Sequence, residues 1–258
     1  MVHVQALPGT PFARLSPDKI VAQAVADARV YVKAGFDAIM IENMHDRPYV
    51  HGAKPPEIVA MMTRVALAVR DVAPDMPLGI QVLSGGNKDA LGIAMATGAS
   101  FIRCENFVFA HVADEGVLER AEAGDLLRYR RSIGAERVRV FCDIKKKHAS
   151  HAITGDLTIG EVAHGAEFFG ADGLVVTGIA TGVATEIEDV AEARAACSLP
   201  ILVGSGVTPE QVPELLAHAD AMIVGSYVKR GGRWENAPDA GRCRGLLRAR
   251  DRAIRSAR

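Results

Sequence analysis

The chain has 258 residues, of which 49% are hydrophobic and 24% charged, so a large core can form and wholesale disorder is excluded. Its 30 lysines and arginines balance 31 acidic residues, and the net charge of −1 argues against a general nucleic-acid binder. Aromatic residues make up only 5% whereas glycine occurs 25 times, a composition more typical of a parallel sheet wrapped in helices than of a β-sandwich.

Short apolar runs alternate with helical patterns along the whole chain. The expected strands are Val2–Leu7, Ala38–Ile41, Leu78–Leu83, Phe101–Cys104, Val138–Ile144, Gly173–Thr177, Ile201–Val203 and Ala221–Val224. The expected helices are Pro17–Ala34, Pro55–Val72, Asp89–Thr97, Asp125–Ile133, Ile159–Phe169, Ile187–Ala195, Pro209–Ala217 and Asp239–Ala257. Ser16 before Pro17 and Thr208 before Pro209 are typical of helix starts.

This alternation predicts the fold. Similar helix-to-strand junctions recur as AGFDAIMI, TGASFIRC, FGADGLVV and HADAMIVG. Eight strand–helix units without a long linker predict a single-domain (β/α)8 TIM barrel, of class α/β, over residues 1–258. A two-domain open α/β protein is the alternative, but no proline- or serine-rich seam supports it.

The cysteines and the N-terminus bear on the compartment. Cys104, Cys142, Cys197 and Cys243 are far apart and form no CxxC pair, which favours reduced thiols over disulfides or a zinc site. The first residues, MVHVQALPG, lack the pattern of a signal peptide, and no window reaches the ~18 consecutive apolar residues of a membrane-spanning helix. We expect a cytoplasmic protein without an integral membrane segment.

In this fold the chemistry is expected where strands run into the following helices. Gly204-Ser205-Gly206 follows the seventh expected strand and Gly225-Ser226 the eighth. Glycine turns let backbone N–H groups approach an anion, and loops at these two positions commonly hold phosphate, so we predict an anion site here. The alternative is that the glycines only form tight turns. Lys229 follows shortly and is expected on the surface.

Acid and base candidates follow the fifth and second strands. Asp143 and Lys145 are two residues apart and should point the same way in a strand, which would place a carboxylate beside an ammonium group. His148 titrates near neutrality, and Glu42 ends an apolar run. The alternative is a solvated loop with a structural ion pair. A divalent metal at Glu42, Asp143 or His148 is less favoured because no spacing-specific motif is present, and no cofactor is predicted.

Other strand ends offer substrate contacts, namely His3, Gln81, Arg103 and Thr177. A buried Arg103 needs a partner, for which Glu105 and Glu42 are candidates. The loop 106–122 is long for its position and could act as a lid or as a contact in a homo-oligomer through Phe107, Phe109 and His111. The arginine-rich 242–258 is expected to be a solvated helix face rather than a nucleic-acid or membrane contact.

Several segments together resemble the BtpA/SgcQ family. They are His3-Val4-Gln5-Ala6-Leu7-Pro8-Gly9-Thr10-Pro11, Ile41-Glu42-Asn43 with Asp46 and Pro48, Asp143-Ile144-Lys145-Lys146-Lys147-His148, Thr177-Gly178 with Thr181-Gly182, Val203-Gly204-Ser205-Gly206-Val207, and Ile223-Val224-Gly225-Ser226. The resemblance implies a TIM-like barrel and, for photosynthetic members, a role in photosystem I biogenesis. The segments 81–87 and 103–106 depart from the pattern of those members.

Two functions follow from these observations. The first is a lyase- or isomerase-type enzyme that moves a proton on a phosphorylated or sugar-like metabolite, with a small anionic molecule as ligand. The second is a non-catalytic factor for biogenesis or stabilisation of a membrane protein complex. The fold alone does not choose between them.

Overall fold

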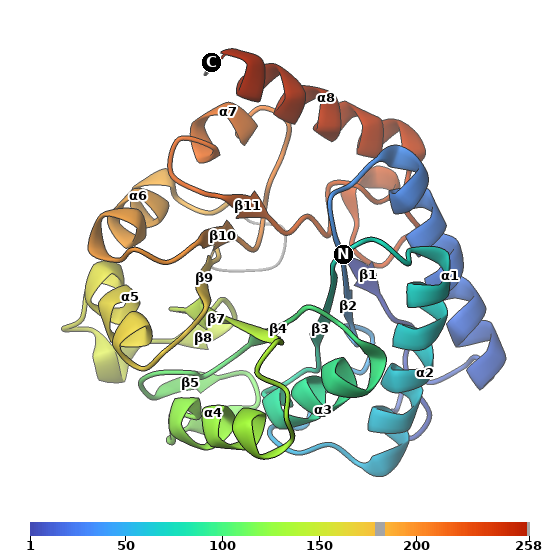
Figure 1. Ribbon diagram of the computed structural model, residues 1–258, viewed down its shortest axis with the longest axis horizontal. Coiled ribbons are helices and arrows are strands. Elements are labelled where there is room, and N and C mark those ends of the chain that lie inside the picture. The colour runs from blue at the N-terminus through green and yellow to red at the C-terminus, as the bar shows by residue number, and fades with distance from the viewer. Residues whose placement is uncertain (179–183, 257–258) are drawn as a thin grey trace. The chain divides into compact units, whose positions relative to one another are not determined.

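Figure 1 shows the computed structural model, which describes residues 1–178 and 184–256. Thr181 and Gly182 of the family resemblance lie outside the described residues. The chain packs into two compact units. The first consists of Met1–Cys104 and Asp125–Arg139, and the second of Glu105–Gly124 and Val140–Arg258. That residues 1–258 form a single domain remains a prediction.

The first unit is a parallel sheet with helices between its strands. The strands pair in the order β1 (Val2–His3), β2 (Ile39–Glu42), β3 (Leu78–Gln81) and β4 (Phe101–Cys104). The connecting helices are α1 (Pro17–Ala34), α2 (Pro56–Val72) and α3 (Asn87–Thr97), which lie outside the strands in Figure 1. Most of α4 (Ala123–Ser132) also belongs to this unit. Nearly all strand residues are buried, as expected of strands covered on both faces.

The second unit repeats this plan. Its parallel strands pair in the order β7 (Arg139–Ile144), β9 (Gly173–Val176), β10 (Ile201–Val203) and β11 (Ala221–Met222). The helices are α5 (Ile159–Phe168), α6 (Ile187–Ala196), α7 (Val212–Leu215) and α8 (Ala240–Ser256), with short 3-10 turns η1 (Ala152–Thr154) and η2 (Arg230–Gly232). Helices α5 and α6 pack side by side (Figure 1).

The long segment 106–122 contains an antiparallel hairpin that was not predicted from the sequence pattern. Its strands are β5 (His111–Ala113) and β6 (Gly116–Leu118), and β5 also pairs with β8 (Ala149–Ser150), so the small sheet has the order β6-β5-β8. Phe107 before the hairpin is fully buried. This sheet ties the chain that follows β4 to the chain that follows β7.

Helix α7 is shorter than expected. It covers only Val212–Leu215, whereas the pattern predicted a helix from Pro209 to Ala217. Pro213 lies in its first turn, and proline has no backbone N–H to donate to a preceding turn, so the helix begins just before this residue. The residues from Thr208 to Gln211 form a turn instead, in which Thr208 N donates to the Gln211 side chain at 3.3 Å.

Two further findings concern the cysteines and the described helices. All four cysteines are free thiols, and three of them are buried. Within the described ranges, no helix combines the length and the apolar character needed to cross a membrane.

Candidate functional site

In the first unit, three of the predicted residues lie side by side at the carboxyl ends of neighbouring strands. His3 pairs in register with Glu42, and Glu42 with Gln81. All three side chains are buried, and His3 Nε2 lies 3.6 Å from Glu42 Oε2. Arg103 is also buried and comes one residue after Ile102, which pairs with Ile80. The side chains predicted at the ends of these four strands therefore lie at one edge of this sheet.

Asn43 and Asp46 form hydrogen bonds between the loops at the same edge of the sheet. Asp46 accepts hydrogen bonds from Leu7 N at 2.7 Å and from Asn43 Nδ2 at 2.9 Å, and Asn43 Oδ1 accepts from Leu83 N at 2.6 Å. Burial raises the pKa of Asp46 above its ordinary value, although these two hydrogen bonds and the charge of Lys54 act against the shift. The pair therefore holds together the chain that follows β1, β2 and β3.

Two buried oxygens lie next to this network. Gln81 Oε1 and Ser84 Oγ have no hydrogen-bond partner among the residues that the structure describes. Both side chains are at least nine-tenths buried. A buried polar atom without a partner costs about 1–3 kcal/mol, so a bound polar group that supplies a donor would recover that free energy.

In the second unit, β7 ends at Ile144, and the lysines that follow differ from the expectation. Lys145 has φ 44°, so the strand alternation that was to align it with Asp143 is broken there. Its Nζ donates to the Leu157 carbonyl. Among the lysines of this loop, Lys146 is the buried one, and its Nζ lies 3.1 Å from Glu105 Oε1. The structure shows an ion pair between Lys146 and Glu105 at this strand end, and the pairing of Asp143 with Lys145 stays a prediction.

A second carboxylate completes a buried cluster around Lys146. Glu115 Oε2, at the turn of the β5–β6 hairpin, lies 3.9 Å from Lys146 Nζ. Burial by itself lowers the pKa of Lys146, but the charges of Glu105 and Glu115 outweigh it and raise the pKa above its ordinary value. Lys146 is therefore a fixed positive charge at neutral pH. Glu105, one of the two partners considered for Arg103, is an acceptor for this lysine.

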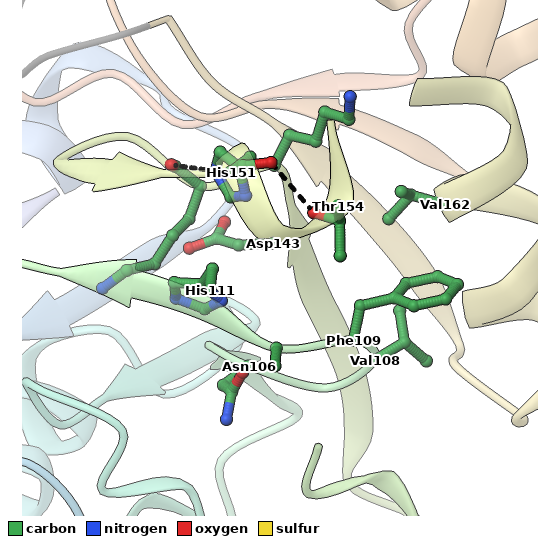
Figure 2. Close-up of a pocket in the computed structure, with 11 residues that line it drawn as sticks. Asn106, Val108, Phe109, His111, Asp143, His151, Thr154 and Val162 are labelled. Carbon is green, nitrogen blue, oxygen red and sulfur yellow. Dashed lines mark hydrogen bonds between the residues drawn. The ribbon is translucent and has the colours of Figure 1, made fainter. Parts of the chain in front are cut away.

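Asp143 lines a small cavity next to this cluster. Figure 2 shows it among the side chains of Asn106, His111 and His151, which line the same cavity. The rings of His111 and His151 have centroids 5.4 Å apart. The volume is about 20 Å³, which leaves room for one water-sized molecule. Asn106 Oδ1 is buried and, within the described residues, accepts no hydrogen bond, so it is available to such a molecule.

His148 lies apart from the buried cluster. Its side chain is 43% exposed, and its Nδ1 lies 3.8 Å from Asp114 Oδ2. Partial burial and the positive charge of Lys147 lower the pKa of His148, and Asp114 opposes this effect. Thr177, at the end of β9, is buried and accepts a hydrogen bond from Lys147 N at 3.0 Å. Thr177 thus holds the loop that carries the lysines.

The predicted anion turns line a cleft at the ends of β10 and β11. Gly206, Gly225 and Ser226 line this cleft, whose volume is about 510 Å³, whereas Gly204 and Ser205 are buried outside its lining. Gly206 has φ 68°, a left-handed conformation that favours glycine. The predicted helix start beyond this turn is replaced by the four residues of α7, so no long helix directs its N-terminus here.

Two arginines that the sequence reading did not single out also line the cleft. Arg242, from the first turns of α8, has its guanidinium carbon 4.2 Å from the centre of the Tyr227 ring, and its Nε donates to the Tyr227 carbonyl. Arg233 is exposed, with Nε 3.8 Å from Glu235 Oε2. The cleft therefore combines glycine turns, a serine hydroxyl and two guanidinium groups with one carboxylate.

Lys229 was expected on the surface, and this prediction was wrong. The side chain is only 1% exposed. A bridge between Lys229 and Pro238, together with a hydrogen bond from Asp239 N to Val228 O at 2.8 Å, turns this segment inward.

Within the residues described, no cluster of three or more His, Cys, Asp or Glu side chains suits a metal ion.

The sequence matches the BtpA family over residues 1–252. The chain belongs to the BtpA family. An uncharacterised mitochondrial protein of Caenorhabditis elegans is 45% identical over 246 residues, covering 94% of this chain and 88% of its own. The photosystem I biogenesis protein BtpA of Synechocystis is 31% identical over 257 residues, covering 99% of this chain and 88% of its own. The resemblance found in the short sequence segments is thus confirmed.

Solved structures show the fold of this BtpA-family chain. Thiamine phosphate pyrophosphorylase from Pyrococcus furiosus has a TM-score of 0.60 at 14% identity, covering 89% of this chain and 90% of its own. (S)-3-O-geranylgeranylglyceryl phosphate synthase from Thermoplasma acidophilum, in complex with sn-glycerol-1-phosphate, has a TM-score of 0.59 at 17% identity, covering 88% and 86%. The predicted α/β class and (β/α)8 TIM-barrel fold are confirmed.

Proposed function

We propose that this chain is an enzyme that moves a proton on a phosphorylated or sugar-like small molecule, as a lyase or isomerase does. The observation that supports this most is the cleft in which Gly206, Gly225 and Ser226 lie with Arg233 and Arg242. Backbone N–H groups at glycine turns and guanidinium groups are the donors that proteins use for phosphate. Both solved proteins compared above are named for phosphorylated compounds, which agrees with this reading.

The buried cluster after β7 supplies the acid–base part of the proposal. Asp143 is the proposed base, which takes a proton from a carbon beside a carbonyl group through one water molecule in the small cavity. The electron pair left on carbon moves to the carbonyl oxygen, and the charge of Lys146 favours the resulting enolate. Protonated Asp143 then returns the proton to a different position.

Other predicted residues keep supporting roles in this proposal. Lys145, which also lines the cavity, adds positive charge beside Asp143. His148 is mostly neutral near pH 7 because its pKa is lowered, so it can accept a proton. The first unit, taken by itself, holds a separate candidate acid or base in Glu42 with its neighbour His3, and the buried oxygens of Gln81 and Ser84 are candidate acceptors for hydroxyl groups there.

Binding is tested first by calorimetry with ribose 5-phosphate and ribose. We expect saturable binding of the phosphate ester only, and at least tenfold weaker binding by Arg242→Met, because a charge-assisted contact to phosphate is lost. Arg244→Met is the matched control, since Arg244 is an exposed residue of the same helix. Equal affinity of wild type and Arg242→Met, or no binding at all, would contradict the anion site.

Proton transfer is tested by incubating a panel of sugar phosphates with the protein in D₂O and recording ¹H NMR spectra. We expect one member to exchange a carbon-bound proton for deuterium in the presence of wild-type protein and not with Asp143→Asn. Exchange that proceeds equally with Asp143→Asn would remove Asp143 from the proposal.

A second candidate is a non-catalytic factor in the biogenesis of a membrane complex. The name of the Synechocystis relative favours it, and so does the exposed apolar pair Val112 and Val117 on the β5–β6 hairpin. Complementation of a deletion strain separates the two functions. If the Asp143→Asn variant, inactive in proton exchange, restores full levels of such a complex, the non-catalytic function is the correct one.

A further inference from the structure

The loop after β11 is built to hold three side chains in the cleft. Its two arms, on either side of Arg233–Glu235, are joined by the Lys229–Pro238 bridge and by a hydrogen bond from Arg230 N to Ala237 O at 3.0 Å. The Asn236 side chain also donates to the Arg230 carbonyl at 2.8 Å. These bonds between the arms fix the tip of the loop.

Buried residues anchor the base of this loop. Val228 and Lys229 are 0% and 1% exposed, and Asp239 N closes the base by its bond to the Val228 carbonyl. The tip residues Arg233, Trp234 and Glu235 all line the cleft. The backbone of a loop anchored in this way loses little conformational freedom when a ligand binds, which favours binding.

The size of the cleft exceeds what a phosphate group needs. Its volume of about 510 Å³ is in the range of about 300–1,000 Å³ that is common for sites of whole small molecules. The glycine turns, Ser226 and Arg242 supply the hydrogen-bond donors and the positive charge that an anion would need. Trp234, the single tryptophan of the chain, is the largest side chain of the remaining lining.

Tyr227 and Trp234 are the two aromatic residues that line the cleft. The guanidinium of Arg242 lies over the ring of Tyr227, 4.2 Å from its centre, so one face of Tyr227 is covered. Trp234 lies between Arg233 and Glu235, at the tip of the loop whose two arms are hydrogen-bonded to each other. An indole held in a cleft beside guanidinium groups suits a planar ring system, because stacking on an aromatic side chain strengthens binding of any such ring.

We propose that the ligand of this cleft is a phosphate ester that carries a planar aromatic group, as a nucleoside monophosphate does, with that group stacked on Trp234. The inference rests on the proposed function, in which the cleft holds the phosphate of a small molecule. The hydroxyl of Thr208 and the carboxylate of Glu235, which also line the cleft, can hydrogen-bond to sugar hydroxyl groups between the two ends of such a ligand.

The single tryptophan makes the test direct. Wild-type protein is titrated with AMP, ribose 5-phosphate and adenosine, and tryptophan fluorescence and calorimetric affinity are recorded. We expect AMP to quench the fluorescence saturably and to bind about tenfold or more tightly than ribose 5-phosphate, the range that stacking on one aromatic side chain gives. Adenosine should bind more weakly than AMP because it lacks the phosphate.

Two variants of Trp234 distinguish stacking of the ligand on an aromatic ring from a general packing role of this side chain. Affinities are measured by calorimetry. Trp234→Leu should lower the affinity for AMP to that for ribose 5-phosphate and leave the latter unchanged, and Trp234→Phe should restore part of the loss. Equal affinities of AMP and ribose 5-phosphate in wild type, or an equal loss for both in Trp234→Leu, would overturn the stacking inference while leaving the anion site intact. If neither phosphate ester binds wild-type protein, the inference and the proposed function both fail.

Discussion

Lys146 Nζ lies 3.1 Å from Glu105 Oε1, and both side chains are buried beside the end of β7. Glu115 adds a second carboxylate 3.9 Å from the same ammonium group. Burying a charged side chain costs free energy unless the charge is paired. Here the Lys146 ammonium pairs with two carboxylates, both from the segment that follows β4. The cluster thus binds the β5–β6 hairpin to the loop after β7 and keeps a positive charge next to Asp143.

Removing this cation should destabilise the fold strongly. We expect Lys146→Met to lower the free energy of unfolding by about 3–5 kcal/mol, because it leaves buried carboxylates without their counter-charge. Lys88→Met, at an exposed lysine, is the control and should change stability by less than about 0.5 kcal/mol. Urea denaturation measures both. A loss below about 1 kcal/mol in Lys146→Met would show that the carboxylates are not held by this ion pair.

The same pair has a defined pH dependence. The raised pKa of Lys146 in the folded state means that its contribution is complete below the ordinary lysine pKa of about 10.4 and is lost as the pH rises through the raised value. The stability difference between wild type and Lys146→Met should therefore be constant from pH 7 to pH 9 and shrink above about pH 10.5. A difference that already declines between pH 7 and pH 9 would contradict the raised pKa.

Helix caps provide a matched test of local structure. Thr158 and Glu161 form a capping box at the start of α5, with Thr158 Oγ1 accepting from Glu161 N at 3.2 Å. Thr158→Ala should cost about 1 kcal/mol. Ser16 occupies the N-cap of α1 but its side chain makes no capping bond, so Ser16→Ala should be nearly neutral. Equal losses in thermal unfolding of the two variants would contradict this assignment.

His148 should titrate below its ordinary pKa of 6.5, because burial and Lys147 disfavour its charged form. Folding then gains stability as the pH rises through the folded-state pKa toward 6.5, since the unfolded state binds the proton more tightly. Asp114→Asn removes the opposing charge and should lower the pKa further. ¹H NMR of the ring, assigned with His148→Gln, measures both midpoints. A midpoint that does not move in Asp114→Asn would exclude this coupling.

Gly173 should not tolerate a side chain. It pairs with Phe141 across β9 and β7, and an added Cβ would lie 2.7 Å from Phe141 Cδ1 and 3.0 Å from the Pro200 carbonyl oxygen. We expect Gly173→Ala to cost about 1–3 kcal/mol through overpacking. Gly245→Ala in α8 meets nothing closer than 4.0 Å and should instead stabilise by about 0.5–1 kcal/mol. Two changes of the same sign in urea denaturation would contradict this difference.

Local signals in the sequence predicted the elements well. Helix α1 has the expected bounds because Pro17 suits the first helical position and Gly35, with φ 91°, ends the helix. Strands β4 and β10 also match residue for residue. The β5–β6 hairpin was missed because its strands are three residues long and one of them pairs with β8, more than thirty residues further along the chain. Such pairing is non-local and leaves no periodic signal.

The sequence predicted the loops of the candidate site better than it predicted the individual side chains in them. Gly206, Gly225 and Ser226, which follow two strand ends, do line one cleft, and their role in binding stays a prediction. Strand alternation, which was expected to align Lys145 with Asp143, stops at Lys145 because this residue has a positive φ, which no neighbouring residue type signals. The sequence did not single out Lys146, which is buried in the same loop. Trp234 was not singled out because the loop after β11 brings it to the cleft, whereas Arg242 reaches the cleft from the first turns of α8.

The most direct test of the proposed function is a crystal structure of the protein soaked with ribose 5-phosphate. We expect the phosphate group in the cleft, within hydrogen-bond distance of the backbone N–H groups at Gly206 and Gly225, the Ser226 hydroxyl and the Arg242 guanidinium. A fully occupied ligand bound elsewhere, or an empty cleft at saturating ligand, would contradict the account.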